Sequence, residues 1–115
     1  MPALVHISAA TGRDQLTPMG PRVGADAGDP QIRQLPVETG TGARVGIWEC
    51  TPGSYRVDDK PASETCYVIE GRAVLEDDET GSRVTITAGD FLTMPKGWSG
   101  RWTIEETLRK AYTTF

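Results

Sequence analysis

Cysteine and histidine could supply this chain with a nucleophile or with metal ligands, and both residue types are scarce. The 115 residues include two cysteines, Cys50 and Cys66, and one histidine, His6. A cysteine nucleophile needs a neighbouring base, most often a histidine, that holds it as a thiolate. Neither cysteine has such a partner, so a Cys–His dyad is excluded unless His6 reaches one of them. We predict two free thiols and a histidine at the surface or in an interface.

Aromatic and charged side chains recur at alternate positions, and alternation places side chains on the same face of a strand. The groups that share a face in this way are Trp48 with Cys50, Glu64 with Cys66 and Val68, Trp102 with Ile104, and Lys110 with Tyr112. Three tryptophans in a chain of this length need burial or a ligand. Trp48 and Trp102 therefore either fill a core or form the walls of a binding site, and both interpretations stay open.

The composition favours one small, mostly β domain. Hydrophobic residues make up 37% of the chain and charged residues 24%, as in ordinary globular proteins. The 13 glycines and 8 prolines are more than long helices tolerate, whereas turn-rich β folds accept them.

The charge balance narrows the range of partners. The formal net charge is −4 and no block of basic residues is present, so we expect neither nucleic acid nor an anionic membrane as a partner. The longest apolar run, 66–69, is far shorter than the roughly 20 residues of a membrane span. The N-terminal residues do not resemble a secretory signal, and we predict a cytoplasmic location.

The composition and residue pattern of the sequence change near residue 43. Residues 1–43 are rich in proline and glycine, and only 3–7 and 32–37 resemble short strands. We predict that they form a partly extended arm on the body or on a neighbouring subunit, with a flexible tail as the alternative. The pattern of residues 44–115 predicts short strands about ten residues apart, and this spacing is typical of a sandwich or barrel. The expected strands are 44–50, 65–69, 72–76, 83–87 and 91–94, with turns at 51–53, 70–71, 77–82 and 89–90.

The C-terminal segment allows two interpretations. The pattern Thr103 to Glu106 resembles a helix capping box, and glutamates precede basic residues at helical spacing, so 104–112 could be a helix. Alternatively, the apolar residues on either side fit two strands joined by a short turn at 105–107. We favour this hairpin because it continues the preceding pattern.

A series of motifs follows in a specific order through the second part of the chain. They are Gly46-Ile-Trp48, Pro52-Gly53, Glu64-Thr-Cys-Tyr-Val-Ile-Glu-Gly71, Gly89-Asp90, Pro95-Lys-Gly-Trp98, Trp102 and Lys110-Ala-Tyr112. Together they resemble the cupin superfamily, and more narrowly the DUF861 or cupin_3 group related to the cupin domain of ureidoglycine aminohydrolase. The resemblance implies a single-domain, all-β jelly-roll barrel, usually a homodimer, with a small-molecule pocket at its centre.

The chain departs from that superfamily at its metal site, which uses three histidines and a glutamate. Glu64 stands at the glutamate position. Counted from Gly53, the first two histidine positions hold Asp59 and Pro61; counted back from Glu64, they hold Val57 and Asp59 or Asp58 and Lys60. The third histidine position holds Gly100. A mixed site of Asp58 or Asp59 with Glu64 and Cys66 is conceivable, but the nearby Lys60 would oppose a cation. We therefore predict no metal and no cofactor.

The resemblance also implies which side chains meet at the barrel's interior or rim. They are Trp48, Tyr55, Glu64, Cys66, Lys96, Trp98, Trp102, Lys110 and Tyr112. A carboxylate inside a barrel needs a partner, and Lys110 is the first candidate and Lys96 the second. A Glu64–Lys110 pair either fixes the last strand or recognises a small polar ligand.

Three functions are consistent with these residues. We favour a small-molecule-binding protein with a binding or regulatory role, whose ligand resembles an amino acid, ureide or amide. The alternative is an enzyme acting on a ureido or amino-acid-like compound, as the resemblance suggests. In that enzyme Glu64 would be an acid or base with a pKa raised by burial, and Lys110 would polarise a carbonyl. A third possibility is an interaction module whose barrel is filled with side chains.

Overall fold

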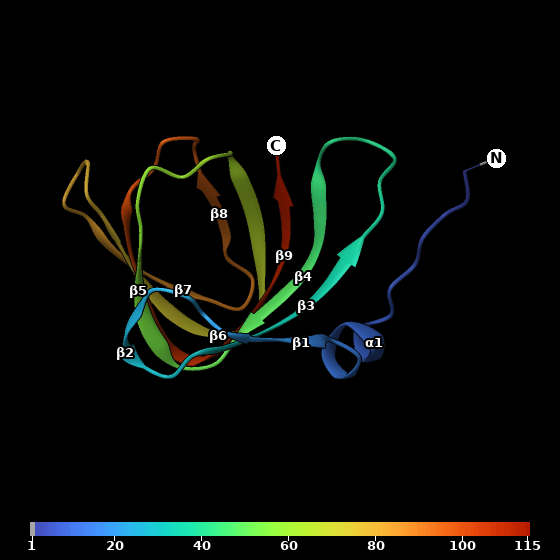
Figure 1. The fold of residues 1–115 in the computed structure, drawn as a ribbon, viewed down its shortest axis with the longest axis horizontal. Coiled ribbons are helices and arrows are strands. Elements are labelled where there is room, and N and C mark those ends of the chain that lie inside the picture. The colour runs from blue at the N-terminus through green and yellow to red at the C-terminus, as the bar shows by residue number, and fades with distance from the viewer. Residues whose placement is uncertain (1) are drawn as a thin grey trace.

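The computed structural model describes residues 2–115, and strands account for most of them. The elements in chain order are α1 (Ala9–Asp14), β1 (Thr17–Pro21), β2 (Ala25–Gly28), β3 (Gln31–Val37), β4 (Arg44–Cys50), β5 (Gly53–Val57), β6 (Glu64–Asp77), β7 (Arg83–Thr87), β8 (Phe91–Met94) and β9 (Gly100–Thr114) (Figure 1). The predicted all-β class is confirmed. No helix among residues 2–115 has the length and apolar character needed to cross a membrane.

Two long strands organise the barrel. β6 and β9 pair antiparallel along their whole length, from Glu64 opposite Thr114 to Asp77 opposite Gly100. On its other edge β9 pairs with β5 through its first half and with β4 through its second half. β7 and β8 add to the other edge of β6. Because one strand joins these neighbours at different points, the sheet curls on itself (Figure 1).

The corner of the curl lies at Gly71, and here two predictions were wrong. Residues 70–71 were expected to be a turn between two strands, but β6 continues through them with shifts in its pairing register. Gly71 has a φ of +97°, and a Cβ at this position would lie 2.1 Å from the carbonyl oxygen of Thr107. The expected turn at 105–107 is likewise part of the continuous strand β9. Neither the helix nor the hairpin proposed for this segment forms, because β9 bends around the corner without leaving the sheet.

The N-terminal segment supplies strands to the same sheet. β3 pairs with β4 from Ile32 opposite Cys50 to Val37 opposite Val45, while β1 pairs with β3 and β2 pairs with β5. Gly12 of α1 faces Ile47 of β4, since a Cβ on Gly12 would lie 3.1 Å from the Ile47 Cδ1 atom. The short strand expected at 3–7 is absent, and residues 2–8 have no regular secondary structure.

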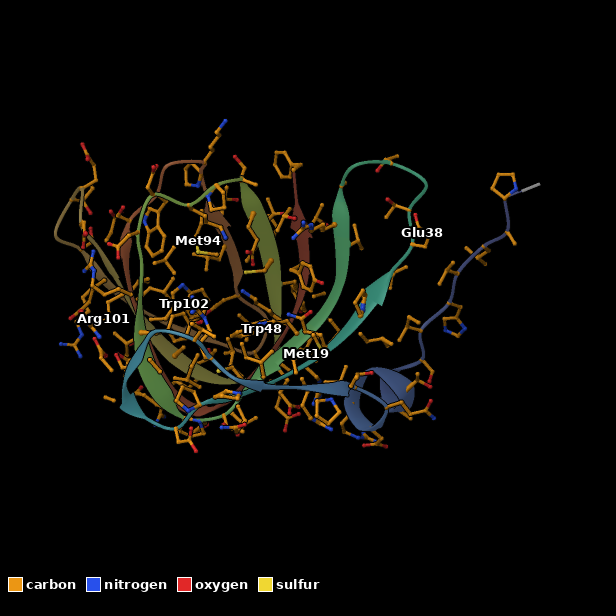
Figure 2. All side chains as sticks on the ribbon, in the orientation of Figure 1. Met19, Glu38, Trp48, Met94, Arg101 and Trp102 are labelled. Carbon is orange, nitrogen blue, oxygen red and sulfur yellow. The ribbon has the colours of Figure 1, made fainter. Side chains whose placement is uncertain are left out.

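The core lies inside the curl and follows the alternation read from the sequence. Cys50, Val68, Trp102, Ile104 and Leu108 are at most 2% exposed. Figure 2 shows Trp48, Trp102 and Met94 within the curled sheet. At one end, the β3–β4 loop, the β5–β6 connection and the C-terminus lie together (Figure 1). These segments contribute residues to the pocket described next.

Candidate functional site

A pocket of about 630 Å³ extends from this end into the barrel. Such a volume lies in the range of small-molecule sites. Residues of β4, β5, β6 and β9 form its inner part, and the β3–β4 loop and the β5–β6 connection form its outer part. Of the predicted site residues, the pocket is lined by Trp48, Tyr55, Glu64, Trp102, Lys110 and Tyr112.

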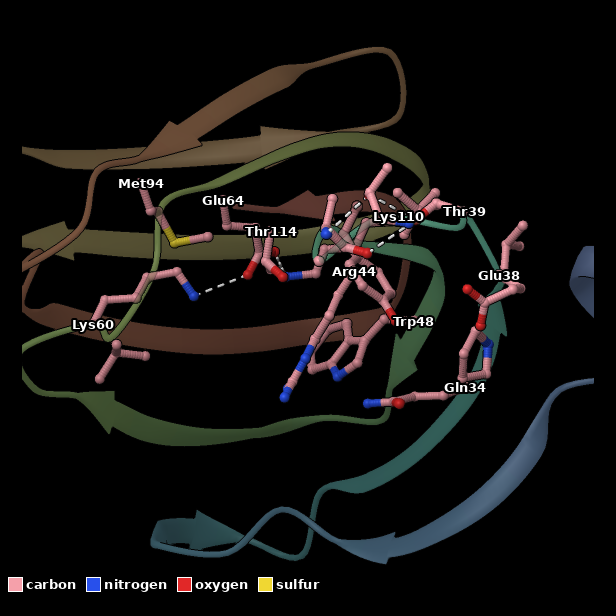
Figure 3. A pocket seen from close by; sticks show the side chains of 18 of the residues that line it. Gln34, Glu38, Thr39, Arg44, Trp48, Lys60, Glu64, Met94, Lys110 and Thr114 are labelled. Carbon is pink, nitrogen blue, oxygen red and sulfur yellow. Dashed lines mark hydrogen bonds and ion pairs between the residues drawn. The ribbon is translucent and has the colours of Figure 1, made fainter.

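A buried cluster of three charges, Lys60, Glu64 and Lys110, lies in this pocket (Figure 3). Glu64 Oε1 accepts a hydrogen bond from Lys60 Nζ at 2.9 Å, and Oε2 accepts one from Lys110 Nζ at 2.8 Å. The side chains of Glu64 and Lys110 are 9% and 8% exposed, and that of Lys60 is 15% exposed. The expected Glu64–Lys110 pair is therefore present, but the second lysine is Lys60 rather than Lys96.

Backbone pairing holds each member of the cluster in place. Glu64 is the first residue of β6, and Lys110 of β9 lies opposite both Trp48 of β4 and Val68 of β6. Lys60 lies in the β5–β6 connection. Its backbone N–H donates to the Trp98 carbonyl at 2.9 Å, and its own carbonyl accepts from the Gly97 N–H at 2.7 Å. The loop that carries Trp98 thus positions Lys60 without contributing its own lysine.

The cluster keeps Glu64 ionised. Burial of the carboxyl raises its pKa, but the charges and hydrogen bonds of Lys110 and Lys60 together outweigh this effect, so the pKa of Glu64 lies below its ordinary value. The raised pKa expected for Glu64 as an enzymatic acid or base was wrong. A carboxylate that already accepts from two ammonium groups is a weak base, so this arrangement favours recognition over proton transfer.

Aromatic rings surround Lys110. Its Nζ atom lies 4.4 Å from the ring centroid of Trp48 and 4.7 Å from that of Trp102. The two indoles meet edge to face, with centroids 6.4 Å apart and planes at 62°. Tyr55 stacks on Trp102 at 6.4 Å with nearly parallel planes, and the Arg22 guanidinium lies 4.2 Å from the Tyr55 ring centroid. Cation–π contacts of this kind stabilise a buried ammonium group without a second carboxylate.

Three predicted site residues are not in the pocket lining. Cys66 is 2% exposed and part of the protein interior, because its position in β6 faces inward. Lys96 is exposed, and Trp98 packs against the hydrophobic core. Both belong to the β8–β9 loop, none of whose residues lines this pocket.

The pocket residues that sequence reasoning missed include three basic residues, Arg22, Arg44 and Lys60, and the apolar Met94. Alternation within β4 could have found Arg44, which lies on the same strand face as Trp48. Met94, at the end of β8, pairs with Glu64 across the strands. Arg22 precedes β2 in a segment without periodicity, and no sequence signal pointed to its contact with Tyr55.

The donor atoms of this barrel do not suit the metal site of the cupin superfamily. No group of three or more His, Cys, Asp or Glu side chains comes together among residues 2–115. The carboxylate at the superfamily's glutamate position is occupied by two ammonium groups, which repel a divalent cation. His6 lies exposed in the N-terminal segment.

The cysteines offer no nucleophile in the folded protein. Both are free and buried. Burial raises the pKa of the Cys50 thiol to about 11 and also raises the pKa of Cys66. Both thiols are therefore protonated near neutral pH, in the unreactive form.

Comparison with known proteins identifies relatives of this barrel. The model of the EutQ-like cupin domain matches residues 37–112. A DUF861 protein of unknown function from Pseudomonas syringae pv. tomato has a TM-score of 0.79 and 29% identity over 90% of this chain and 46% of that chain. This chain thus spans less than half the length of the Pseudomonas protein. A DUF861 protein from Thermotoga maritima has a TM-score of 0.56 and 35% identity over 60% of this chain and 76% of that chain.

The EutQ protein of Clostridium difficile has a TM-score of 0.64 and 20% identity over 75% of this chain and 68% of that chain, a likeness that shows the fold alone. None of the curated proteins compared with this chain matches it. The match over 37–112 includes β4 to β8 and nearly all of β9, and so contains the charge cluster. The predicted cupin jelly-roll is confirmed, and the chain belongs to the EutQ-like cupin domain family.

Proposed function

We propose that this protein binds a small polar molecule in the barrel pocket, without a metal ion, in a binding or regulatory role. The observation that carries the proposal is the Lys60–Glu64–Lys110 cluster in an open pocket of about 630 Å³. A small number of polar groups, held rigidly among aromatic side chains, is typical of small-molecule sites. The open space also argues against a barrel filled with side chains, the third function considered above.

An enzymatic role on a ureido or amino-acid-like compound receives less support. It would need Glu64 to exchange a proton near neutral pH, and the lowered pKa of Glu64 works against that. The buried thiols do not provide another reacting group. The pocket therefore supports binding better than catalysis.

Tryptophan fluorescence can test the proposal with little background. Trp48 and Trp102 line the pocket, whereas Trp98 does not. In a Trp98→Phe protein, emission therefore reports on the pocket alone. We expect a ligand from a library of amino acids, ureides, amides, sugars and organic acids to change this emission and to raise the Tm.

Two variants serve as controls for the fluorescence response. Trp48→Ala should abolish the response while Lys96→Met, outside the pocket, should keep it. If no compound of any charge class binds with a Kd below about 1 mM, the proposed function is wrong. Stoichiometric metal in the purified protein would contradict its metal-free form. The homodimer and the cytoplasmic location predicted from the sequence stay predictions, and sedimentation of the full chain tests the first.

A further inference from the structure

The charge cluster is not electrically balanced. One carboxylate, Glu64, serves two ammonium groups, so the cluster carries one excess positive charge. Glu38 also lines the pocket, but its Oε1 atom accepts from the Gly40 N–H at 3.0 Å, and no salt bridge within 4.0 Å joins it to a basic group among residues 2–115. Within the described chain, no second carboxylate reaches the two lysines.

The excess charge is most accessible at Lys60. The Lys110 ammonium donates to Glu64 and lies against two indole rings, and its side chain is 8% exposed. The Lys60 ammonium has one hydrogen-bond partner in the described chain, Glu64, and its side chain is the more exposed of the two. An ammonium group has three N–H donors, so Lys60 has two left for a ligand.

The rest of the pocket has the same sign of charge. Arg22 and Arg44 line it together with the two lysines, against Glu38 and Glu64. Arg22 is engaged with the Tyr55 ring and the Val23 carbonyl, while Arg44 forms no salt bridge among residues 2–115. The pocket is thus positive in a chain whose net charge is −4. A partly buried excess charge is costly unless an opposite charge or water compensates it.

We propose that the ligand of this pocket is a small organic carboxylate, whose carboxylate group binds at Lys60 beside Glu64. The inference rests on the proposed function and specifies the class of ligand. A single carboxylate neutralises the excess charge of the cluster. The body of the ligand contacts the apolar and aromatic side chains that lie around the lysines: Trp48, Val57, Met94 and Tyr112.

Three probes with the same ring and different charges test this proposal: benzoate, benzamide and benzylammonium. Calorimetry and Trp98→Phe fluorescence at low salt should show benzoate binding at least about tenfold more tightly than the other two. Organic acids should also predominate among the compounds that bind from the wider library. Inorganic phosphate is a fourth probe, which detects a site for any anion.

Lys60→Met is the decisive variant, with Lys96→Met as the matched control. Lys60→Met leaves a balanced Glu64–Lys110 pair, so the protein should fold and melt near the wild-type Tm. It should lose the preference for benzoate over benzamide, whereas Lys96→Met should keep it, because Lys96 is exposed and outside the pocket.

The outcomes separate the two proposals. Binding without preference for carboxylates, an unchanged preference in Lys60→Met, or equal binding of phosphate would overturn the carboxylate assignment and leave the binding function standing. Binding of no compound at all would overturn both.

Discussion

Glu64 is the residue on which the inner pocket depends, because it holds two lysines in place at once. Both of its oxygens accept charge-assisted hydrogen bonds, at 2.9 Å and 2.8 Å. Burying the two ammonium groups is favourable only while the carboxylate remains, and removal of its charge leaves both of them uncompensated. In this barrel, the partners left behind would be two like charges inside an aromatic pocket.

Glu64→Gln should therefore destabilise the protein by about 3 kcal/mol, which is typical of a broken buried ion pair. Urea unfolding near neutral pH measures this loss. Glu79→Gln is the matched control, since Glu79 is exposed in the β6–β7 turn and should change stability by less than about 0.5 kcal/mol. Equal effects of the two substitutions would contradict the role assigned to the cluster.

The contribution of Glu64 should also depend on pH, with a defined sign. Its pKa is lower in the folded protein than in the unfolded chain, so ionised Glu64 stabilises the fold. This contribution is complete above the unfolded pKa of about 4.3 and disappears as the pH falls through the lower folded pKa. The difference in unfolding free energy between wild type and Glu64→Gln should be constant near neutrality and shrink below about pH 4. A difference that grows on acidification would contradict the lowered pKa.

The cysteines should be unreactive until the protein unfolds. Cys50 and Cys66 are 0% and 2% exposed, and burial raises the pKa of both thiols. A colourimetric disulfide reagent at neutral pH should label neither thiol in the native protein and both in urea. Rapid labelling of the native protein would show that the interior around one of the cysteines opens. Cys66→Ser, compared with Cys50→Ser, would identify the thiol involved.

At the scale of the elements, the corner between β6 and β9 depends on a glycine. Gly71 combines a positive φ with a close approach to the Thr107 backbone. Gly81, in the β6–β7 turn, also has a positive φ, of +71°, but a Cβ there would meet nothing within 4 Å. The pair separates the cost of backbone conformation from the cost of a steric clash.

Gly81→Ala should cost about 1 kcal/mol, as expected for a left-handed conformation alone. Gly71→Ala should cost at least about 3 kcal/mol, because the added methyl meets a backbone carbonyl that can move only with the sheet. Thermal or urea unfolding of both variants measures the difference. Similar losses would show that the corner tolerates a side chain.

The strands that alternate strictly could be predicted from the sequence, and the corner could not. The predicted strands 44–50, 83–87 and 91–94 form with the expected bounds, and each ends at turn residues. At the corner, Glu105, Glu106 and Thr107 are all exposed, so the alternation stops although the strand continues. Gly71 in β6 and the polar run 105–107 in β9 each resemble a turn locally. Only the pairing between β6 and β9 shows that both strands continue through them.

The residues of the site also fall into those that the sequence predicts and those that it does not. Trp48, Glu64, Trp102 and Lys110 were predictable because they alternate within strands and because a buried carboxylate requires a cation. The choice between Lys60 and Lys96 was not, because both lie in loops that lead to or from a strand. Arg22 depends on the path of the N-terminal segment across the barrel, which local pattern does not determine.

For the whole molecule, the open question is how far residues 1–43 act as a separate arm. Arg22 covers the Tyr55 ring, and Arg101 of β9 binds Asp26 of β2 through a bond of 2.8 Å from Nη1. β2 also pairs directly with β5. These contacts tie the segment to the wall of the pocket, whereas residues 2–8 have no regular structure and are mostly exposed.

Two truncated chains test this connection. A chain starting at residue 8 keeps α1 with its Ser8 cap and should melt at the temperature of the full chain. A chain starting at residue 30 loses β1, β2 and Arg22, so it exposes an edge of β5 and one face of Tyr55. Its Tm should fall by about 5 °C or more, and the emission of its pocket tryptophans should shift toward that of exposed indoles. If both truncated chains melt and emit alike, the residues before 30 form an arm that the barrel does not need, and the pocket does not depend on Arg22.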